Sequence, residues 1–235
     1  CSHPQINKLT NPLEYKVIYI INTRMKIIFE GGGFPAFWYG LGYGIELLKD
    51  NTPTFCAGYS AGALVAVILT CSNVEIDRVI ELYGNMPLGT RFGGMAEFIA
   101  SMMNNVLPHD AHEYANDYIG IILCDPNNNS KCKMVTKWES RDDLIQCLVA
   151  SCYIPCFMGC ARFSDELYQC RDAVFSCDLS TFLNNNFDLI VSRPAQTRTF
   201  SIEGLCENLS VVTNDGMFTL LNAGSKAFEE ENKTK

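Results

Sequence analysis

The sequence lacks two features that would assign it to a broad class at once. None of its apolar runs reaches the ~18 to 20 residues that a membrane-spanning helix needs. It also has no surplus of positive charge, because 18 lysines and arginines stand against 26 aspartates and glutamates, a net charge of −8. Proteins that bind nucleic acid through its phosphates need a basic surface, so nucleic acid is not expected as a partner.

The twelve cysteines lack the spacing that would give them a chemical role. No Cys-x-x-Cys pair recurs at zinc-finger spacing, and residues such as Cys56, Cys147 and Cys152 lie in apolar stretches. Reduced thiols that pack as small apolar side chains are the favoured interpretation. This pattern predicts a cytoplasmic protein rather than a disulfide-linked extracellular scaffold.

The length of 235 residues allows one domain with a substantial core. Residues 1–24 differ from the rest of the chain, since they are polar and contain one short β-like run at residues 17–21. We expect them to be an extension outside the native domain, and an extra edge strand is the alternative. The domain itself is predicted over residues 25–230, with a frayed tail at residues 231–235.

Strand and helix patterns alternate along the chain, which predicts an α/β fold. A Ser140-x-x-Asp143 capping box marks the start of one predicted helix. The predicted strands are at residues 26–29, 54–57, 118–124, 131–138, 160–163, 167–170, 187–191 and 209–213, and the predicted helices at 35–49, 61–69, 74–83, 95–105, 140–152 and 217–230.

A nucleophile elbow is indicated by Gly58-x-Ser60-x-Gly62, which lies between an apolar run and a segment of helical composition. In such an elbow a sharp turn between a strand and a helix presents a serine. The glycines on both sides of the serine avoid clashes between the turn and its neighbours. The alternative is a tight turn whose serine only caps the helix. The motif by itself does not decide between these two roles.

Gly31-Gly32-Gly33 occupies the equivalent place in the preceding strand–helix unit. Backbone N–H groups in such a turn can line an oxyanion hole or cradle a phosphate. Because consecutive parallel strands usually neighbour each other, both turns are expected at the same carboxyl edge of the sheet. The glycine triplet and Ser60 would then face each other, which favours the nucleophile over the cap.

Histidine is scarce, with only His3, His109 and His112 in the chain. None lies in the C-terminal half, so the Ser, acid, His order of the α/β-hydrolases is not available. A carboxylate that accepts the serine proton directly is therefore expected. The candidates are Asp172, which follows a predicted strand and is the first choice, and then Asp165, Asp178 and Asp188.

The methionine-rich segment at residues 95–106 carries an apolar helical face. Such a face is expected in the core, and a lipid-accepting groove is the alternative. His109 and His112, just after it, have a spacing that could hold a metal on one helix face. No third ligand with a clear spacing lies nearby, so capping and surface roles are expected for this segment.

Together these residues resemble the patatin-like phospholipase domain family, in particular the branch that contains adipose triglyceride lipase. The resemblance covers about residues 26–228 and implies a three-layer α/β/α fold with a mainly parallel central sheet. It is carried by the glycine triplet, the elbow, the late Asp172 and the stretches at residues 107–113, 140–146, 150–155 and 220–227.

The resemblance implies a lipid acyl hydrolase that cleaves carboxylic esters of acylglycerols or phospholipids. Ser60 would be the nucleophile of a Ser–Asp dyad, Asp172 the general base, and the N–H groups of Gly31, Gly32 and Gly33 the oxyanion hole. No metal and no cofactor are implied. The expected partner is a lipid ester substrate, any contact with membranes or lipid droplets would be peripheral, and no protein partner is indicated.

Asp172 is followed by Ala173-Val174, where the family usually has Gly-Gly or Gly-Ala. A catalytically silent homologue that binds lipid or regulates another protein is therefore the alternative function. The intact serine elbow and glycine triplet favour the enzyme.

Overall fold

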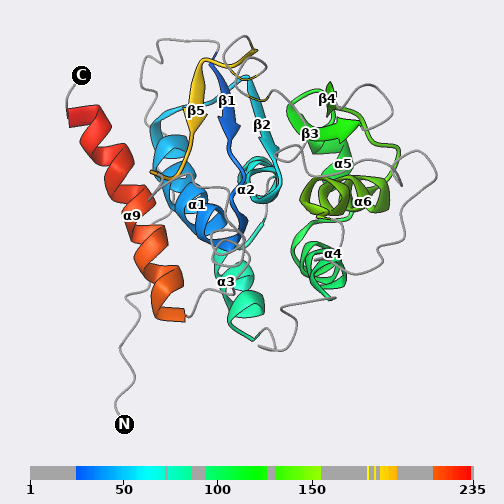
Figure 1. Cartoon of the computed structure of the whole chain (residues 1–235), viewed down its shortest axis with the longest axis horizontal. Coiled ribbons are helices and arrows are strands. Elements are labelled where there is room, and N and C mark those ends of the chain that lie inside the picture. Colours follow the sequence, from blue (N-terminus) through cyan, green and yellow to red (C-terminus); the bar gives the residue numbers. More distant parts are fainter. Residues whose placement is uncertain are drawn as a thin grey trace.

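The computed structural model describes residues 25–71, 74–85, 94–125, 131–154, 179, 183, 186–194 and 214–233. Among these residues, five strands form a sheet in the order β4-β3-β2-β1-β5 (Figure 1). All the pairings are parallel except that of β4, which runs antiparallel to β3 at the edge. The strands are β1 (Lys26–Phe29), β2 (Phe55–Tyr59), β3 (Ile119–Asp125), β4 (Lys131–Val135) and β5 (Leu189–Val191).

Both faces of this sheet are buried. Along β1, Ile27 belongs to the larger apolar cluster and Ile28 to a smaller one on the opposite face, as the alternation of side chains along a strand requires. Leu183, in helical conformation, packs in the smaller cluster. A mainly parallel sheet with helices packed on one face and a helical residue buried on the other agrees with the predicted three-layer α/β/α fold. The helices are α1 (Gly33–Asp50), α2 (Ala61–Thr70), α3 (Ile76–Gly84), α4 (Met95–Val106), α5 (Ala111–Ala115), α6 (Arg141–Cys152) and α9 (Asn214–Lys233).

Most predicted elements are found, with ends that differ by a few residues. Ser140 caps α6 as expected, because its hydroxyl oxygen accepts a hydrogen bond from the Asp143 N–H at 3.1 Å. The methionine-rich helix α4 buries Met102 and Met103 in the core, which confirms a packing role. The predicted extension at residues 1–24 and the predicted strands at 160–163, 167–170 and 209–213 lie outside the described residues.

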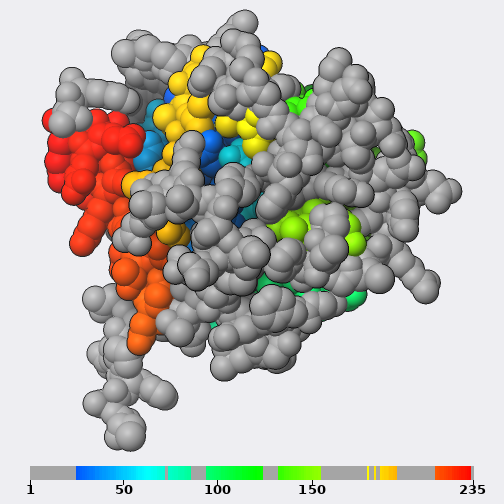
Figure 2. Space-filling view, viewed as in Figure 1, coloured from blue at the N-terminus to red at the C-terminus, as the bar shows by residue number. Residues whose placement is uncertain are grey.

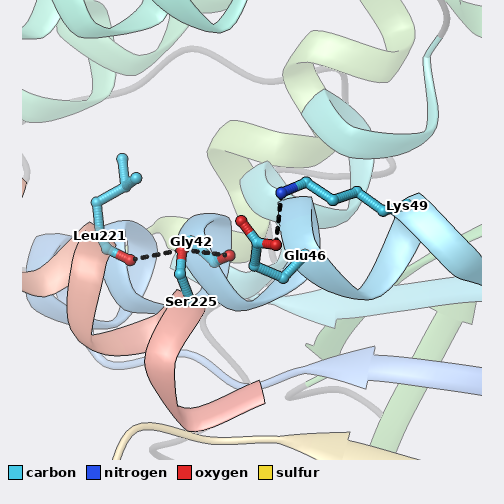
Figure 3. Close-up of polar contacts among 5 residues, drawn as sticks. All are labelled: Gly42, Glu46, Lys49, Leu221 and Ser225. Atoms are coloured by element: carbon cyan, nitrogen blue, oxygen red, sulfur yellow. Dashed lines mark hydrogen bonds and ion pairs between the residues drawn. The ribbon is translucent and has the colours of Figure 1, made fainter. Parts of the chain in front are cut away.

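The C-terminal helix α9 packs along α1 through small residues and forms one flank of the molecule (Figures 1 and 2). The Ser225 hydroxyl lies between the two helices, 3.2 Å from the carbonyl oxygen of Gly42 and 3.3 Å from that of Leu221 (Figure 3). Nearer the end of the helix, the Tyr43 hydroxyl donates to Glu231 Oε2 at 2.7 Å. This contact lies within α9, which continues to Lys233, three residues beyond the predicted end of this helix at residue 230.

Gly224→Ala is expected to lower the free energy of unfolding by about 2 kcal/mol, although alanine is the better helix former. A methyl group at Gly224 would overlap the Tyr39 carbonyl oxygen and lie 2.7 Å from the Tyr43 backbone nitrogen, so α9 would have to move away from α1. Asn222→Ala on the exposed side of α9 is the matched control, with an expected change below about 0.5 kcal/mol. Thermal unfolding of both variants makes the comparison, and equal stability would contradict the close helix contact.

Candidate active site

Ser60 lies at the point where β2 ends and α2 begins, in a backbone conformation that few residues other than glycine adopt. Its φ is 52° and its ψ is −133°, and its side chain is only 7% exposed. Residues held in such conformations cluster at functional sites. Ser60 occupies the N-cap position of α2, yet its hydroxyl makes no capping hydrogen bond. The alternative in which Ser60 is only a helix cap is therefore not supported.

Gly58 and Gly62 allow α2 to pack directly against the strands. A methyl group at Gly62 would overlap the Phe29 carbonyl oxygen and lie 2.5 Å from the Phe29 carbonyl carbon. A methyl group at Gly58 would overlap Gly62 itself and lie 2.5 Å from the Ala63 nitrogen. Both glycines of the motif are therefore required by backbone contacts, which hold the elbow tightly against the carboxyl ends of β1 and β2.

The glycine triplet lies beside Ser60, as the sequence predicts. A methyl group at Gly31 would be 2.8 Å from Ser60 Cβ, so the two turns are in contact at the carboxyl edge of the sheet. Gly32 has φ 140° and Gly33 has φ 65°, in the left-handed region that favours glycine. The neighbouring Glu30 N–H is already used, since it donates to the Val191 carbonyl oxygen at 2.9 Å.

Two helix N-termini consequently meet at this edge. Gly32 is the N-cap of α1 and Ser60 that of α2, and neither provides a side-chain cap. Neither helix has an acidic residue in its first turn that would offset the positive end of its dipole. Backbone N–H groups in the first turn of a helix lack intrahelical acceptors. An oxyanion that developed on a group attached to Ser60 would thus form in a region of positive potential.

Ser151, in the last turn of α6, contacts the elbow although no motif in the sequence predicts this contact. It is fully buried, and its hydroxyl oxygen accepts a hydrogen bond from the Ser60 N–H at 2.9 Å. The same hydroxyl donates to the Ile122 carbonyl oxygen at 2.8 Å. A serine within the apolar run of α6 is the only signal in the sequence that could have indicated a buried polar contact.

Of the four aspartates predicted as candidate bases, only Asp188 lies among the described residues. Asp172, Asp165 and Asp178 lie outside the described residues. Asp188 precedes β5 and accepts a hydrogen bond from the Lys26 N–H at 2.8 Å, at the start of β1. That is the amino edge of the parallel strands, about 13 Å from the carboxyl edge across the four residues of β1. Asp188 is therefore too far from Ser60 to act as its base.

Of the two histidines in the described ranges, neither lies at the elbow. His112 belongs to α5, and the adjacent Ala111 carbonyl oxygen contacts Cys71 Sγ at 3.7 Å, just beyond the C-terminal end of α2. Ser60 is at the other end of α2, about 15 Å away along its 10 residues. His109 is exposed. Neither His109 nor His112 is therefore placed to act as the base of Ser60, and His3 lies outside the described residues.

The thiols of Cys56 and Cys71 are buried and form no disulfide. Burial raises the pKa of Cys56 to about 11 and that of Cys71 to about 12, and the negative charge of Asp110 adds to the second shift. Both groups are therefore neutral thiols near pH 7 and pack as small apolar side chains.

Over the residues that the structure describes, no three His, Cys, Asp or Glu side chains gather as a metal site would require. Of the helices in those same ranges, none has both the length and the apolarity needed to cross a bilayer.

Comparisons with known proteins give several relatives, although no family model matches the chain. An omega-hydroxyceramide transacylase of Mus musculus is 27% identical over 154 residues, which are 59% of this chain and 25% of that protein. Patatin-like phospholipase domain-containing protein 2 of Homo sapiens is 30% identical over 149 residues, 57% of this chain and 29% of the relative. Patatin-like phospholipase domain-containing protein 4 of Homo sapiens is 30% identical over 126 residues, 50% of this chain and 49% of the relative. The match thus covers less than half of the length of each relative.

Proposed function

We propose, from its similarity to patatin-like phospholipase domain-containing proteins, that this chain is a lipid acyl hydrolase with Ser60 as its nucleophile. The observation that carries the proposal is the elbow itself. Ser60 has a strained backbone and a hydroxyl that caps no helix, and it lies against the glycine triplet at two helix N-termini. A turn that served only to connect β2 with α2 would need none of these features.

The proposed reaction begins when the Ser60 Oγ attacks the carbonyl carbon of a lipid ester and passes its proton to a base. The carbonyl oxygen becomes an oxyanion, which the N–H groups of Gly31, Gly32 and Gly33 would stabilise. Collapse of this intermediate breaks the bond to the alkoxy oxygen, which takes up the proton and leaves as the alcohol. Water then attacks the acyl-enzyme, releases the fatty acid and regenerates Ser60.

We propose Asp172 as the base. A carboxylate that accepts the serine proton directly has to be partly desolvated and within hydrogen-bond reach of the hydroxyl. The positions of His112 and Asp188, each far from the elbow, support an acid from elsewhere in the chain. The pair Ala173-Val174 after Asp172 keeps the silent lipid-binding homologue as the competing proposal.

Acyl transfer to another lipid is a second candidate function, because the relatives include the omega-hydroxyceramide transacylase and a 1-acylglycerol-3-phosphate O-acyltransferase of Mus musculus. The first half of the reaction would be the same. In the second half, a hydroxyl group of an acceptor lipid would take the place of water. Added acceptor alcohol would then increase the transferred product at the expense of free fatty acid.

Labelling of the full chain with a fluorophosphonate tests the proposed function. We expect one adduct, mapped to Ser60 by peptide mass spectrometry, and hydrolysis of a short-chain ester such as p-nitrophenyl butyrate. Asp172→Asn is expected to reduce the labelling rate by about 10² to 10⁴-fold, whereas the matched variant Asp165→Asn should keep it. A folded wild type that is neither labelled nor hydrolytic would establish the silent homologue instead, and loss of labelling in Asp165→Asn alone would transfer the role of base to Asp165.

A further inference from the structure

The hydrogen bond between Ser60 and Ser151 falls where the β2–β3 ladder should have its next direct rung. In a parallel pair, donors along one strand recur every two residues. Cys56 N donates to the Tyr118 carbonyl oxygen at 2.9 Å, and the register pairs Tyr59 with Ile122. Four residues further along each strand, the same pattern would make Ser60 N donate directly to the Ile122 carbonyl oxygen.

The Ser151 hydroxyl occupies that rung instead. It accepts from Ser60 N at 2.9 Å and donates to the Ile122 carbonyl oxygen at 2.8 Å, so one oxygen atom links the two strands. The hydroxyl thus satisfies both buried backbone groups, the Ser60 N–H and the Ile122 carbonyl oxygen. The inserted atom also separates the end of β2 from β3, at the residue where the chain turns to a positive φ.

We propose that Ser151 is a positioning residue for the nucleophile: its hydroxyl replaces the last rung of the β2–β3 ladder and thereby holds Ser60 in the elbow conformation. The inference rests on the proposed function, since it assigns Ser60 the role of nucleophile. Ser151 itself touches no reacting atom in this scheme. Without its hydroxyl, Ser60 N could bond directly to Ile122, and this closure would rotate the Ser60 backbone away from the glycine triplet.

The test compares Ser151→Ala with Ser151→Gly in the full chain, by the rate of fluorophosphonate labelling of Ser60. We expect Ser151→Ala to be labelled about 10 to 100-fold more slowly than the wild type, as a misplacement of about 1 Å predicts. Ser151→Gly removes the same hydroxyl but leaves space in which a water molecule can bridge the two strands. It should therefore be labelled faster than Ser151→Ala, even though glycine is the poorer helix former. A role in α6 stability alone predicts the opposite order, and that order would overturn the proposal.

Ser225→Ala is the matched control, because it removes a serine hydroxyl that bonds to helix carbonyl oxygens remote from the elbow. Its labelling rate should equal that of the wild type. If Ser151→Ala does not fold, the labelling rates of Ser151→Thr and Ser151→Gly are compared instead. Only the threonine variant keeps a hydroxyl, so its Ser60 should be labelled faster than that of the glycine variant.

Hydrogen exchange of the Ser60 amide, followed by NMR, separates this proposal from the proposed function. Exchange should be at least about tenfold faster in Ser151→Gly than in the wild type and unchanged in Ser225→Ala. If the wild type is not labelled but this difference is found, the hydrolase proposal fails and the role of Ser151 in the elbow stands. If Ser60 of the wild type is labelled, but the Ser151 variants change neither the labelling rate nor the exchange rate of the Ser60 amide, the role of Ser151 is refuted and the hydrolase proposal stands.

Discussion

Ser60→Ala is expected to abolish ester hydrolysis while leaving the protein folded. Loss of a serine nucleophile lowers kcat by about 10⁴ to 10⁶-fold, and no fluorophosphonate adduct should form at this position. Stability should change little, since the Ser60 hydroxyl caps no helix and its backbone N–H remains bonded to Ser151. The measurements are turnover of p-nitrophenyl butyrate and thermal unfolding of the purified variant.

Ser60→Gly extends this prediction to the strain in the elbow. Both variants lack the hydroxyl, but only glycine adopts φ 52° and ψ −133° without a Cβ penalty. We therefore expect Ser60→Gly to be more stable than Ser60→Ala by about 1 kcal/mol, which is about 2 to 4 °C in Tm for a chain of this size. In an unstrained turn the order would be reversed, because glycine adds entropy to the unfolded chain. Finding alanine the more stable of the two would mean that the elbow stores no strain.

Gly62→Ala has the largest expected effect on stability. The added methyl group would overlap the Phe29 carbonyl oxygen and lie 2.7 Å from the Glu30 carbonyl oxygen. These are backbone atoms of β1 and of the turn after it, so no side chain can rotate to make room. We expect a loss of about 3 kcal/mol, or about 6 to 12 °C in Tm. The rate of fluorophosphonate labelling of Ser60 should fall as well, because the clash displaces α2 and thereby moves Ser60 away from the glycine triplet.

Gly40→Ala provides the matched control within the core. Gly40 is a buried helical residue of α1, but a methyl group there would meet only side-chain atoms at 3.6 Å, an ordinary contact distance. The same substitution should therefore raise stability by up to about 1 kcal/mol through helix propensity. Differential scanning calorimetry of Gly62→Ala and Gly40→Ala separates the effect of the backbone clash on Tm from the effect of helix propensity. A similar Tm for both variants would rule out the tight approach of α2 to β1.

The sequence was sufficient for the fold wherever one local pattern was strong. The predicted strand at residues 26–29 is β1, and Ser140 caps α6 as its capping box indicates. The facing of Gly31 and Ser60 was also predictable, because neighbouring parallel strands place their following turns at one edge. The resemblance to patatin-like phospholipase domain proteins followed from the same motifs, and the chain is 30% identical to two such proteins over 149 and 126 residues.

Features that depend on contacts between distant residues could not be read from the sequence. The bond between Ser60 and Ser151 joins residues 91 positions apart, and no periodicity of α6 distinguishes a serine that contacts the elbow from one that merely tolerates burial. The end of α9 was placed too early for a similar reason, since Glu231 is held by Tyr43 of α1. Asp172 as the base remains a prediction from the sequence.

The packing of α9 on α1 also has a consequence for how the chain is made. Tyr43 and its partner Glu231 are 188 residues apart, and at ribosomal rates of 5 to 20 residues per second about 10 to 40 s separate their synthesis. During that interval the aromatic outer face of α1, including Tyr39 and Tyr43, has no helix over it. β1 likewise waits for β5, its parallel neighbour from the late part of the chain. Nascent chains that carry α1 and β1 alone are therefore expected to be chaperone clients, and release from the chaperone should coincide with the emergence of α9.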